Sequence, residues 1–70
     1  MKRYFVKVTF HKIDNRVLYF GTHDDRVYEL TPENIKRSGY KTKDGALNNW
    51  HYMEYKRHEG TTVEIVECNA

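Results

Sequence analysis

The chain has 70 residues, of which 39% are hydrophobic and 31% charged, and its formal net charge is +2. This length allows one domain, residues 1–70, with a thin stability margin, because a chain of this size buries only about 60% of its unfolded surface. A single cysteine, Cys68, excludes an intrachain disulfide and a cysteine-based zinc site, and it favours a reducing compartment. Lys7, His11 and Lys12 interrupt the apolar positions near the N-terminus, which predicts neither a signal peptide nor a membrane span. We therefore expect a cytoplasmic protein with no membrane partner.

The charge alternates in blocks along the chain. Residues 1–16 and 36–58 each carry +4, whereas residues 17–35 and 59–70 each carry −3. The two basic blocks could form one patch in space, or they could belong to an ordinary mixed surface that keeps the domain soluble.

The first half of the chain has the pattern of strands. Residues 4–11 alternate with a period of two, and residues 17–20 are apolar on both faces, which predicts that the second strand is central. Residues 27–30 predict a shorter third strand. Asp14 and Asn15 favour the first turn, because both tolerate left-handed dihedrals. The apolar face of the first strand is expected to carry Tyr4, Val6, Val8 and Phe10.

A short helix should follow these strands. Thr31 is an acceptable N-cap, Pro32 suits the first helical position, and Gly39 should end the helix after one or two turns.

The main helix is predicted over residues 43–58, with Thr42 as its N-cap and Gly60 as its end. Its apolar arc should pack on the sheet, at about 100° per residue. Residues 62–66 predict a closing strand. The residues of that arc are Ala46, Leu47, Trp50 and Met53.

This order of elements predicts an α+β fold. We expect a small two-layer domain with an antiparallel sheet of three to four strands and one main helix on one face, in the order β-β-β-short α-α-β.

Aromatic residues on the predicted outer side of the main helix suggest a binding surface. Tyr52 and Tyr55 point away from the expected core arc, with Asn48 and His51 nearby. Exposed large aromatics favour a protein partner or a homodimer, although tyrosines also lie along neighbouring side chains with the hydroxyl in water.

The alternative is a nucleic-acid-binding module. Aromatic and basic side chains interleave on the far face of the sheet and at the helix start, as in single-strand binding platforms. That face could instead be a homodimer interface, or the 31–40 segment could cover it. The residues of this alternative are Phe5, Lys7, His11, Lys41 and Lys43.

No pattern in the sequence indicates an enzyme, a cofactor or a metal. The chain has no phosphate-binding loop and no nucleophile elbow. The tightest group of possible ligands, residues 23–25 (His-Asp-Asp), is typical of a turn, and the four histidines lack a metal-ligand spacing.

The stretch Gly39-Tyr40-Lys41-Thr42-Lys43-Asp44-Gly45-Ala46 resembles the sheet-to-helix junction in the N-terminal arm-binding domain of phage-type tyrosine recombinases. That resemblance implies a three-stranded sheet followed by a helix, and duplex DNA binding by the sheet. The small size of the chain would also fit an origin in a phage or mobile element. The chain departs from that family because it has no catalytic domain and its sheet is less basic, with an acidic strand after the helix. We therefore expect a small non-catalytic binding or accessory protein that acts through protein–protein contacts, including self-association.

Overall fold

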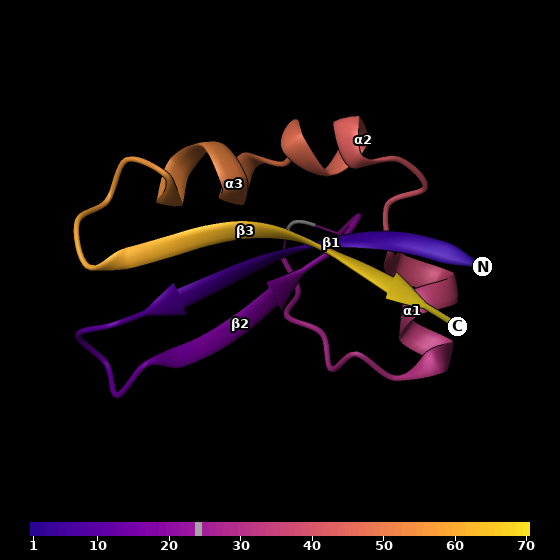
Figure 1. Ribbon diagram of the computed structural model, residues 1–70, viewed down its shortest axis with the longest axis horizontal. Coiled ribbons are helices and arrows are strands. Elements are labelled where there is room, and N and C mark those ends of the chain that lie inside the picture. Colours follow the sequence, from indigo (N-terminus) through magenta and orange to yellow (C-terminus); the bar gives the residue numbers. More distant parts are fainter. Residues whose placement is uncertain (24) are drawn as a thin grey trace.

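The computed structural model describes residues 1–23 and 25–70. Its three strands are β1 (Lys2–Phe10), β2 (Arg16–Phe20) and β3 (Thr61–Asn69), and its three helices are α1 (Pro32–Ser38), α2 (Lys43–Leu47) and α3 (Trp50–Tyr55). The strands form one antiparallel sheet in the order β2-β1-β3. Helices α2 and α3 lie along one side of the sheet, and α1 lies at the end where both termini meet (Figure 1). The predicted α+β class is confirmed.

The central strand is β1, and the prediction of a central β2 is wrong. Residues of β3 pair with β1 along its whole length, from Lys2 opposite Asn69 to Phe10 opposite Thr61. β1 is therefore flanked on both sides, while β2 lies at one edge. The β1–β2 turn forms as predicted, because Asp14 and Asn15 take φ values of 52° and 54°.

The core lies between the sheet and the pair α2–α3. Val6 and Val8 of β1 are fully buried there, together with Phe20 of β2 and Ala46 of α2. Tyr4 and Phe10 pack against this cluster, which confirms the predicted apolar face of β1.

The third predicted strand, residues 27–30, is reduced to one isolated bridge between Val27 and Phe20. The Tyr28 N–H still donates to the Tyr19 carbonyl oxygen at 2.9 Å. The Tyr28 ring then meets the Phe5 ring edge-on, with 6.0 Å between centroids. This segment leaves the sheet because it covers Phe5 on the face away from α3.

The cover over Phe5 is completed by two glycines at points of close backbone approach. A Cβ added to Gly21 would lie 2.3 Å from the Ser38 carbonyl oxygen, and one added to Gly39 would lie 2.5 Å from the Arg3 Cβ. Both added atoms would also press on the Phe5 ring. Tyr28 and α1, which lie between these glycines in the sequence, therefore close one end of the second sheet face.

The helix starts form as predicted. The Thr31 hydroxyl accepts from the Asn34 N–H at 3.2 Å, and the Thr42 hydroxyl accepts from the Gly45 N–H at 3.0 Å. Pro32 occupies the first turn of α1, and Gly39 follows its last residue.

The single helix predicted over residues 43–58 is broken into α2 and α3. The break occurs at Asn49, whose backbone is extended with φ −65° and ψ 136°. Its side-chain oxygen accepts from the His51 N–H at 2.7 Å, so Asn49 caps a new helix. Its amide nitrogen donates to the Tyr40 hydroxyl at 2.7 Å and to the Gly21 carbonyl oxygen at 3.2 Å. Asn49 is only 3% exposed, and these bonds fix the direction of α3 over the sheet.

Candidate protein-binding surface

The break at Asn49 turns α3 so that its tyrosines face the sheet. The Phe20 and His51 rings stack with 3.8 Å between centroids, and the His51 and Tyr55 rings lie nearly parallel at 5.9 Å. Tyr55 also meets Phe10 edge-on at 5.4 Å, and Tyr52 packs against the core cluster. The predicted outward positions of Tyr52 and Tyr55 are therefore wrong, because both side chains are half-buried against β1 and β2.

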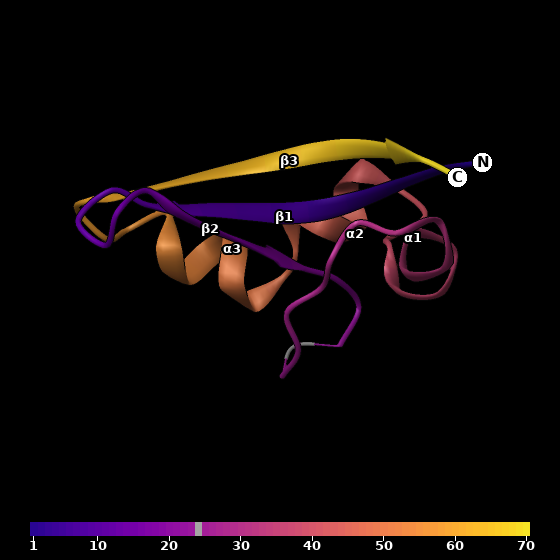
Figure 2. The same ribbon diagram turned by 90° about the horizontal axis from the view of Figure 1, so that it is seen from below.

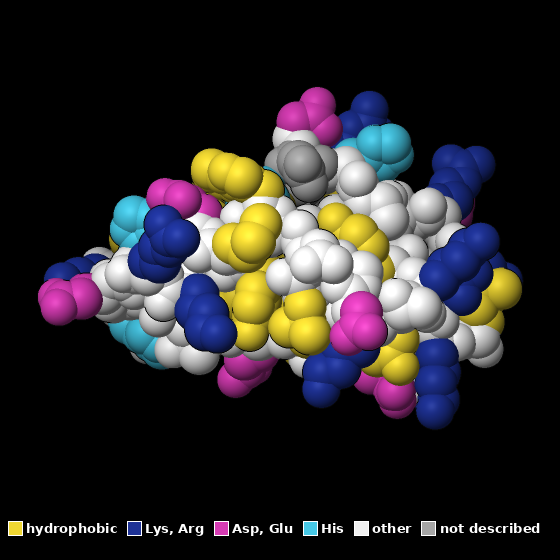
Figure 3. All heavy atoms as spheres, turned by 90° about the horizontal axis from the view of Figure 1, so that it is seen from above, with side chains coloured by type: hydrophobic (Ala, Val, Ile, Leu, Met, Phe, Trp, Pro, Cys, Tyr) yellow, Lys and Arg dark blue, Asp and Glu magenta, His cyan; other side chains and the backbone are white. Residues whose placement is uncertain are grey.

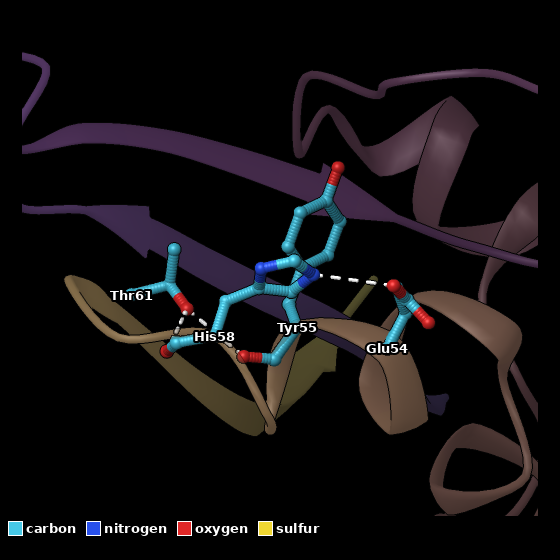
Figure 4. A network of polar contacts seen from close by, with 4 residues as sticks. All are labelled: Glu54, Tyr55, His58 and Thr61. Carbon is cyan, nitrogen blue, oxygen red and sulfur yellow. Dashed lines mark hydrogen bonds and ion pairs between the residues drawn. The ribbon is translucent and has the colours of Figure 1, made fainter.

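Polar contacts at the end of α3 hold this arrangement (Figure 4). The Thr61 hydroxyl is the donor to two carbonyl oxygens. It lies 2.9 Å from that of Tyr55 and 3.0 Å from that of His58. The His58 Nε2 lies 3.2 Å from the Glu54 Oε1, one turn away. The two Thr61 contacts tie the last turn of α3 to the first residue of β3, and with the Asn49 cap they fix the rotation of the helix at both ends.

The outward side of α3 carries two large apolar residues that were expected in the core. Trp50 is 54% exposed and Met53 is 50% exposed. Together with Glu54 and Arg57 they line an open hollow of about 230 Å³. Hydrophobic side chains gather in the middle of this face, with charged groups around them (Figure 3). We call Trp50, Met53, Glu54 and Arg57 the α3 surface.

The two charged residues of the α3 surface differ in whether they already contact a charged or titratable side chain. Glu54 contacts His58, which is charged only when protonated. Within the described part of the chain, Arg57 forms no ion pair. The surface therefore offers an indole, a thioether and an available guanidinium on adjacent turns.

Of the four residues proposed from the sequence as a protein-binding group, only Asn48 is exposed. His51, Tyr52 and Tyr55 belong to the packing between α3 and the sheet. The sequence reasoning missed Trp50 and Met53 because it continued one helical phase across residues 48–49. The signal that could have found them is Asn49, a favoured N-cap residue directly before an aromatic-rich segment.

The residues of the nucleic-acid alternative are not brought together on one surface. Phe5 is fully buried, so its ring offers no face for a base. The Lys7 Nζ lies 4.0 Å from a Glu64 carboxylate oxygen, which reduces its attraction for phosphate.

The remaining members of that alternative set lie in separate places. The His11 Nε2 lies 2.6 Å from the Thr62 hydroxyl, where the β1–β2 turn meets β3. Lys41 and Lys43 are exposed at the start of α2.

Among residues 1–23 and 25–70, no cluster of His, Cys, Asp and Glu has the geometry of a metal site. Asp24, the middle residue of the His-Asp-Asp turn noted in the sequence, lies outside the described residues. In that same part of the chain, no helix has the length and apolar character needed to cross a membrane.

One cysteine has a perturbed thiol. Partial burial of Cys68, and then the neighbouring Glu67 carboxylate, raise the pKa of the thiol above its ordinary value of 9.0. The thiol is therefore protonated and a weak nucleophile near neutral pH.

Comparison with known proteins gives no relative, because the sequence matches no family model and no curated protein, and the structure matches no solved structure.

Proposed function

We propose that this chain is a small non-catalytic binding protein of the cytoplasm, and that it contacts a protein partner through the α3 surface. The observation that carries the proposal is the exposure of Trp50. Tryptophan, with arginine and tyrosine, dominates the energetics of protein interfaces, and it does so where a central aromatic is surrounded by residues that exclude water.

The position of the α3 surface supports this proposal. Trp50 and Met53 lie on the side of α3 away from the sheet, while His51 and Tyr55 on the other side hold the helix to Phe20. The two apolar side chains can therefore meet a partner without any change in the core. Arg57 beside them can pair with a carboxylate of the partner or stack on an aromatic ring.

The proposal is tested by placing a photoreactive benzoylphenylalanine at position 50 in cells and identifying the protein that becomes cross-linked. Ile13 is the matched control, because it is 57% exposed and apolar but lies in the β1–β2 turn. The affinity of the purified partner is then measured by calorimetry for the parent and for the Trp50→Ala/Met53→Ala variant. We expect a loss of more than about tenfold, since aromatic anchors contribute about 2 kcal/mol or more to binding.

Two outcomes would contradict the proposal. One is the same set of cross-links from positions 13 and 50, and the other is an unchanged affinity of the double variant. Cross-links to a nucleic acid that nuclease treatment removes would favour the alternative function instead.

A further inference from the structure

The two edges of the sheet differ in whether other backbone groups of the chain pair with them. At the β2 edge, the Tyr28 N–H bonds the Tyr19 carbonyl oxygen and Val27 bridges to Phe20. At the β3 edge, none of residues 1–23 and 25–70 supplies a comparable backbone partner. β3 runs along the outside of the molecule over its whole length (Figure 2). The chain therefore covers one edge and leaves a strand of nine residues, Thr61–Asn69, open on the other.

The direction of the open backbone groups follows from the pairing of β1. Tyr4 and Tyr40 exchange two backbone hydrogen bonds of 2.8 Å on the β2 side of β1. Glu67, which is opposite Tyr4 across the β1–β3 pair, must then direct its own N–H and C=O away from β1. By alternation, the outward groups of β3 also belong to the other odd-numbered residues: Thr61, Val63, Ile65 and Asn69.

This edge lacks the features that usually prevent pairing. Exposed edges are normally protected by proline, lysine, a bulge or a short strand, and β3 contains neither proline nor lysine and pairs without interruption. Its two acidic residues, Glu64 and Glu67, lie near lysines of β1. The Glu67 carboxylate lies 3.9 Å from the Lys2 Nζ, and the Glu64 carboxylate lies 4.0 Å from the Lys7 Nζ.

We propose that β3 pairs with β3 of a second copy of this chain, antiparallel and about a two-fold axis at Ile65. The inference goes beyond the proposed function, because it uses a different surface and a different partner. It joins the two three-stranded sheets into one sheet with the helices of both copies on the same face. The β2 edge, which the chain covers, then ends the assembly, so pairing closes at a dimer instead of extending into a fibre.

The register at Ile65 is the one that the charges and the strand length favour. Ile65 is the midpoint of Thr61–Asn69, so this register uses every residue of the strand. Glu64 then lies opposite Val66, and Glu67 opposite Val63. A register centred on Glu64 or on Glu67 would place two carboxylates directly opposite each other, which is unfavourable.

The proposal is tested first by the mass of the purified chain in solution, measured by light scattering over a range of concentrations. We expect twice the chain mass of 8.5 kDa. A parent that stays at 8.5 kDa at the highest concentration would overturn the proposal.

The Glu67→Pro variant then removes one outward N–H. Proline is tolerated where an edge N–H faces solvent, so circular dichroism should show a folded chain that has lost the dimer. Glu67→Ala is the matched control, since it loses the same contacts with Lys2 and Tyr4 but keeps the N–H, and it should remain dimeric. A Glu67→Pro variant that is folded and dimeric would overturn the proposal.

Chemical synthesis keeps the test decisive if Glu67→Pro does not fold. A chain methylated on the Ile65 backbone nitrogen loses an outward N–H with no change of side chain, and we expect it to be folded and monomeric. Methylation of the Val66 nitrogen, which is directed at β1, should instead impair folding. A folded dimer of the Ile65-methylated chain would overturn the proposal.

The register has its own test. The proposed pairing places Thr62 opposite Cys68 of the second copy, at a non-hydrogen-bonded pair where Cα atoms are about 4.5 Å apart. This separation suits a disulfide, whereas positions 62 and 68 of one chain are about 20 Å apart. Under mild oxidation, Thr62→Cys should form a disulfide-linked dimer within the concentration range where the parent dimerises. Glu64→Cys, which lies opposite Val66, should not link to Cys68, and equal linking of the two variants would refute this register.

Variants of the α3 surface distinguish this proposal from the proposed function. Trp50→Ala/Met53→Ala should leave the β3 dimer unchanged, and Glu67→Pro should leave binding of the α3 partner unchanged. Loss of the dimer in the Trp50→Ala/Met53→Ala variant would place self-association on α3 and overturn the β3 proposal.

Discussion

The rotation of α3 predicts that two aromatic residues of this helix, Trp50 and Tyr55, differ in their effect on the stability of the domain. Tyr55→Ala removes a half-buried ring that lies 5.4 Å from the Phe10 ring and 5.9 Å from the His51 ring. Trp50→Ala removes a larger ring that is 54% exposed. From residue size alone the tryptophan substitution would be the more damaging, and the structure predicts the reverse.

The magnitudes follow from burial and ring contacts. Truncating a fully buried aromatic costs about 3–5 kcal/mol, so a half-buried Tyr55 should lose about 2 kcal/mol by burial. Its ring pairs with Phe10 and His51 add roughly 0.5–1.5 kcal/mol each, which gives a total of about 3–5 kcal/mol. By the same reasoning Trp50→Ala should cost less, about 2 kcal/mol, since Trp50 is more exposed than Tyr55 and its ring meets that of His51 edge-on at 4.9 Å. A domain of this size has roughly 3–5 kcal/mol in all, so only Trp50→Ala should remain well folded.

The assay is urea unfolding followed by far-ultraviolet circular dichroism, because Trp50→Ala removes the only tryptophan. Tyr55→Phe is the control that keeps the ring, and it should lie within about 1 kcal/mol of the parent. The fluorescence of Trp50 in the parent should be quenched readily by acrylamide, as for an exposed indole. A Trp50→Ala variant less stable than Tyr55→Ala would refute the packing described for α3.

Three further predictions concern the capping residue, the close backbone approach and the thiol. Asn49→Ala should lower the free energy of unfolding by about 2–3 kcal/mol, since a helix cap is lost and a buried carbonyl oxygen loses its donor; Asn49→Asp keeps the cap acceptor and should recover only part of this loss in urea unfolding. Gly39→Ala should cost more than about 2 kcal/mol, because the added Cβ would lie 2.5 Å from the Arg3 Cβ, whereas Gly45→Ala should cost far less in the same thermal unfolding experiment. The raised pKa of Cys68 means that its contribution to stability is complete below about pH 9 and is lost as the pH rises through the folded-state pKa. The difference in unfolding free energy between the parent and Cys68→Ser should therefore change only above about pH 9, and a change confined to neutral pH would contradict this cause.

Local rules of sequence were sufficient for the helix starts and the first turn. Thr31 and Thr42 cap their helices as expected, because a side-chain oxygen and an N–H three residues later need no tertiary contact to meet. Asp14 and Asn15 take the left-handed conformation for the same reason. The apolar face of β1 could also be predicted, since it depends only on the period of two.

The phase of α3 could not be obtained from the same rules. A continuous helix over residues 43–58 and a helix interrupted at Asn49 differ by only a few local contacts. The helical periodicity of the whole segment favours the continuous helix. The interrupted helix is stabilised by contacts that are distant in sequence, because the Asn49 side-chain amide donates to the Gly21 carbonyl oxygen and to the Tyr40 hydroxyl. The interruption changes the direction in which every later side chain of the helix points, and so the proposed binding residues changed with it.

The prediction that β2 is the central strand was wrong for a related reason. An apolar run on both faces of a strand predicts a position at the centre of the sheet. In the structure β2 lies at an edge, and its second face and edge are covered by the irregular chain that includes Val27 and Tyr28. Cover by irregular chain leaves no period in the sequence, so this arrangement required the tertiary structure.

The exposure of Trp50 is informative because of the size of the domain. A chain of 70 residues has a thin margin of stability, and its sheet already needs cover on both faces: α2 and α3 on one, and Tyr28 and α1 on part of the other. Fully burying a large apolar side chain stabilises a fold by about 1.5–3 kcal/mol, a sizeable share of that margin. The structure instead assigns the more deeply buried positions of α3 to His51 and Tyr55 and leaves Trp50 54% exposed. The stability of the chain alone therefore does not account for an apolar side chain held outward by a helix that is fixed at both ends, and this is the physical reason for proposing a partner at the α3 surface.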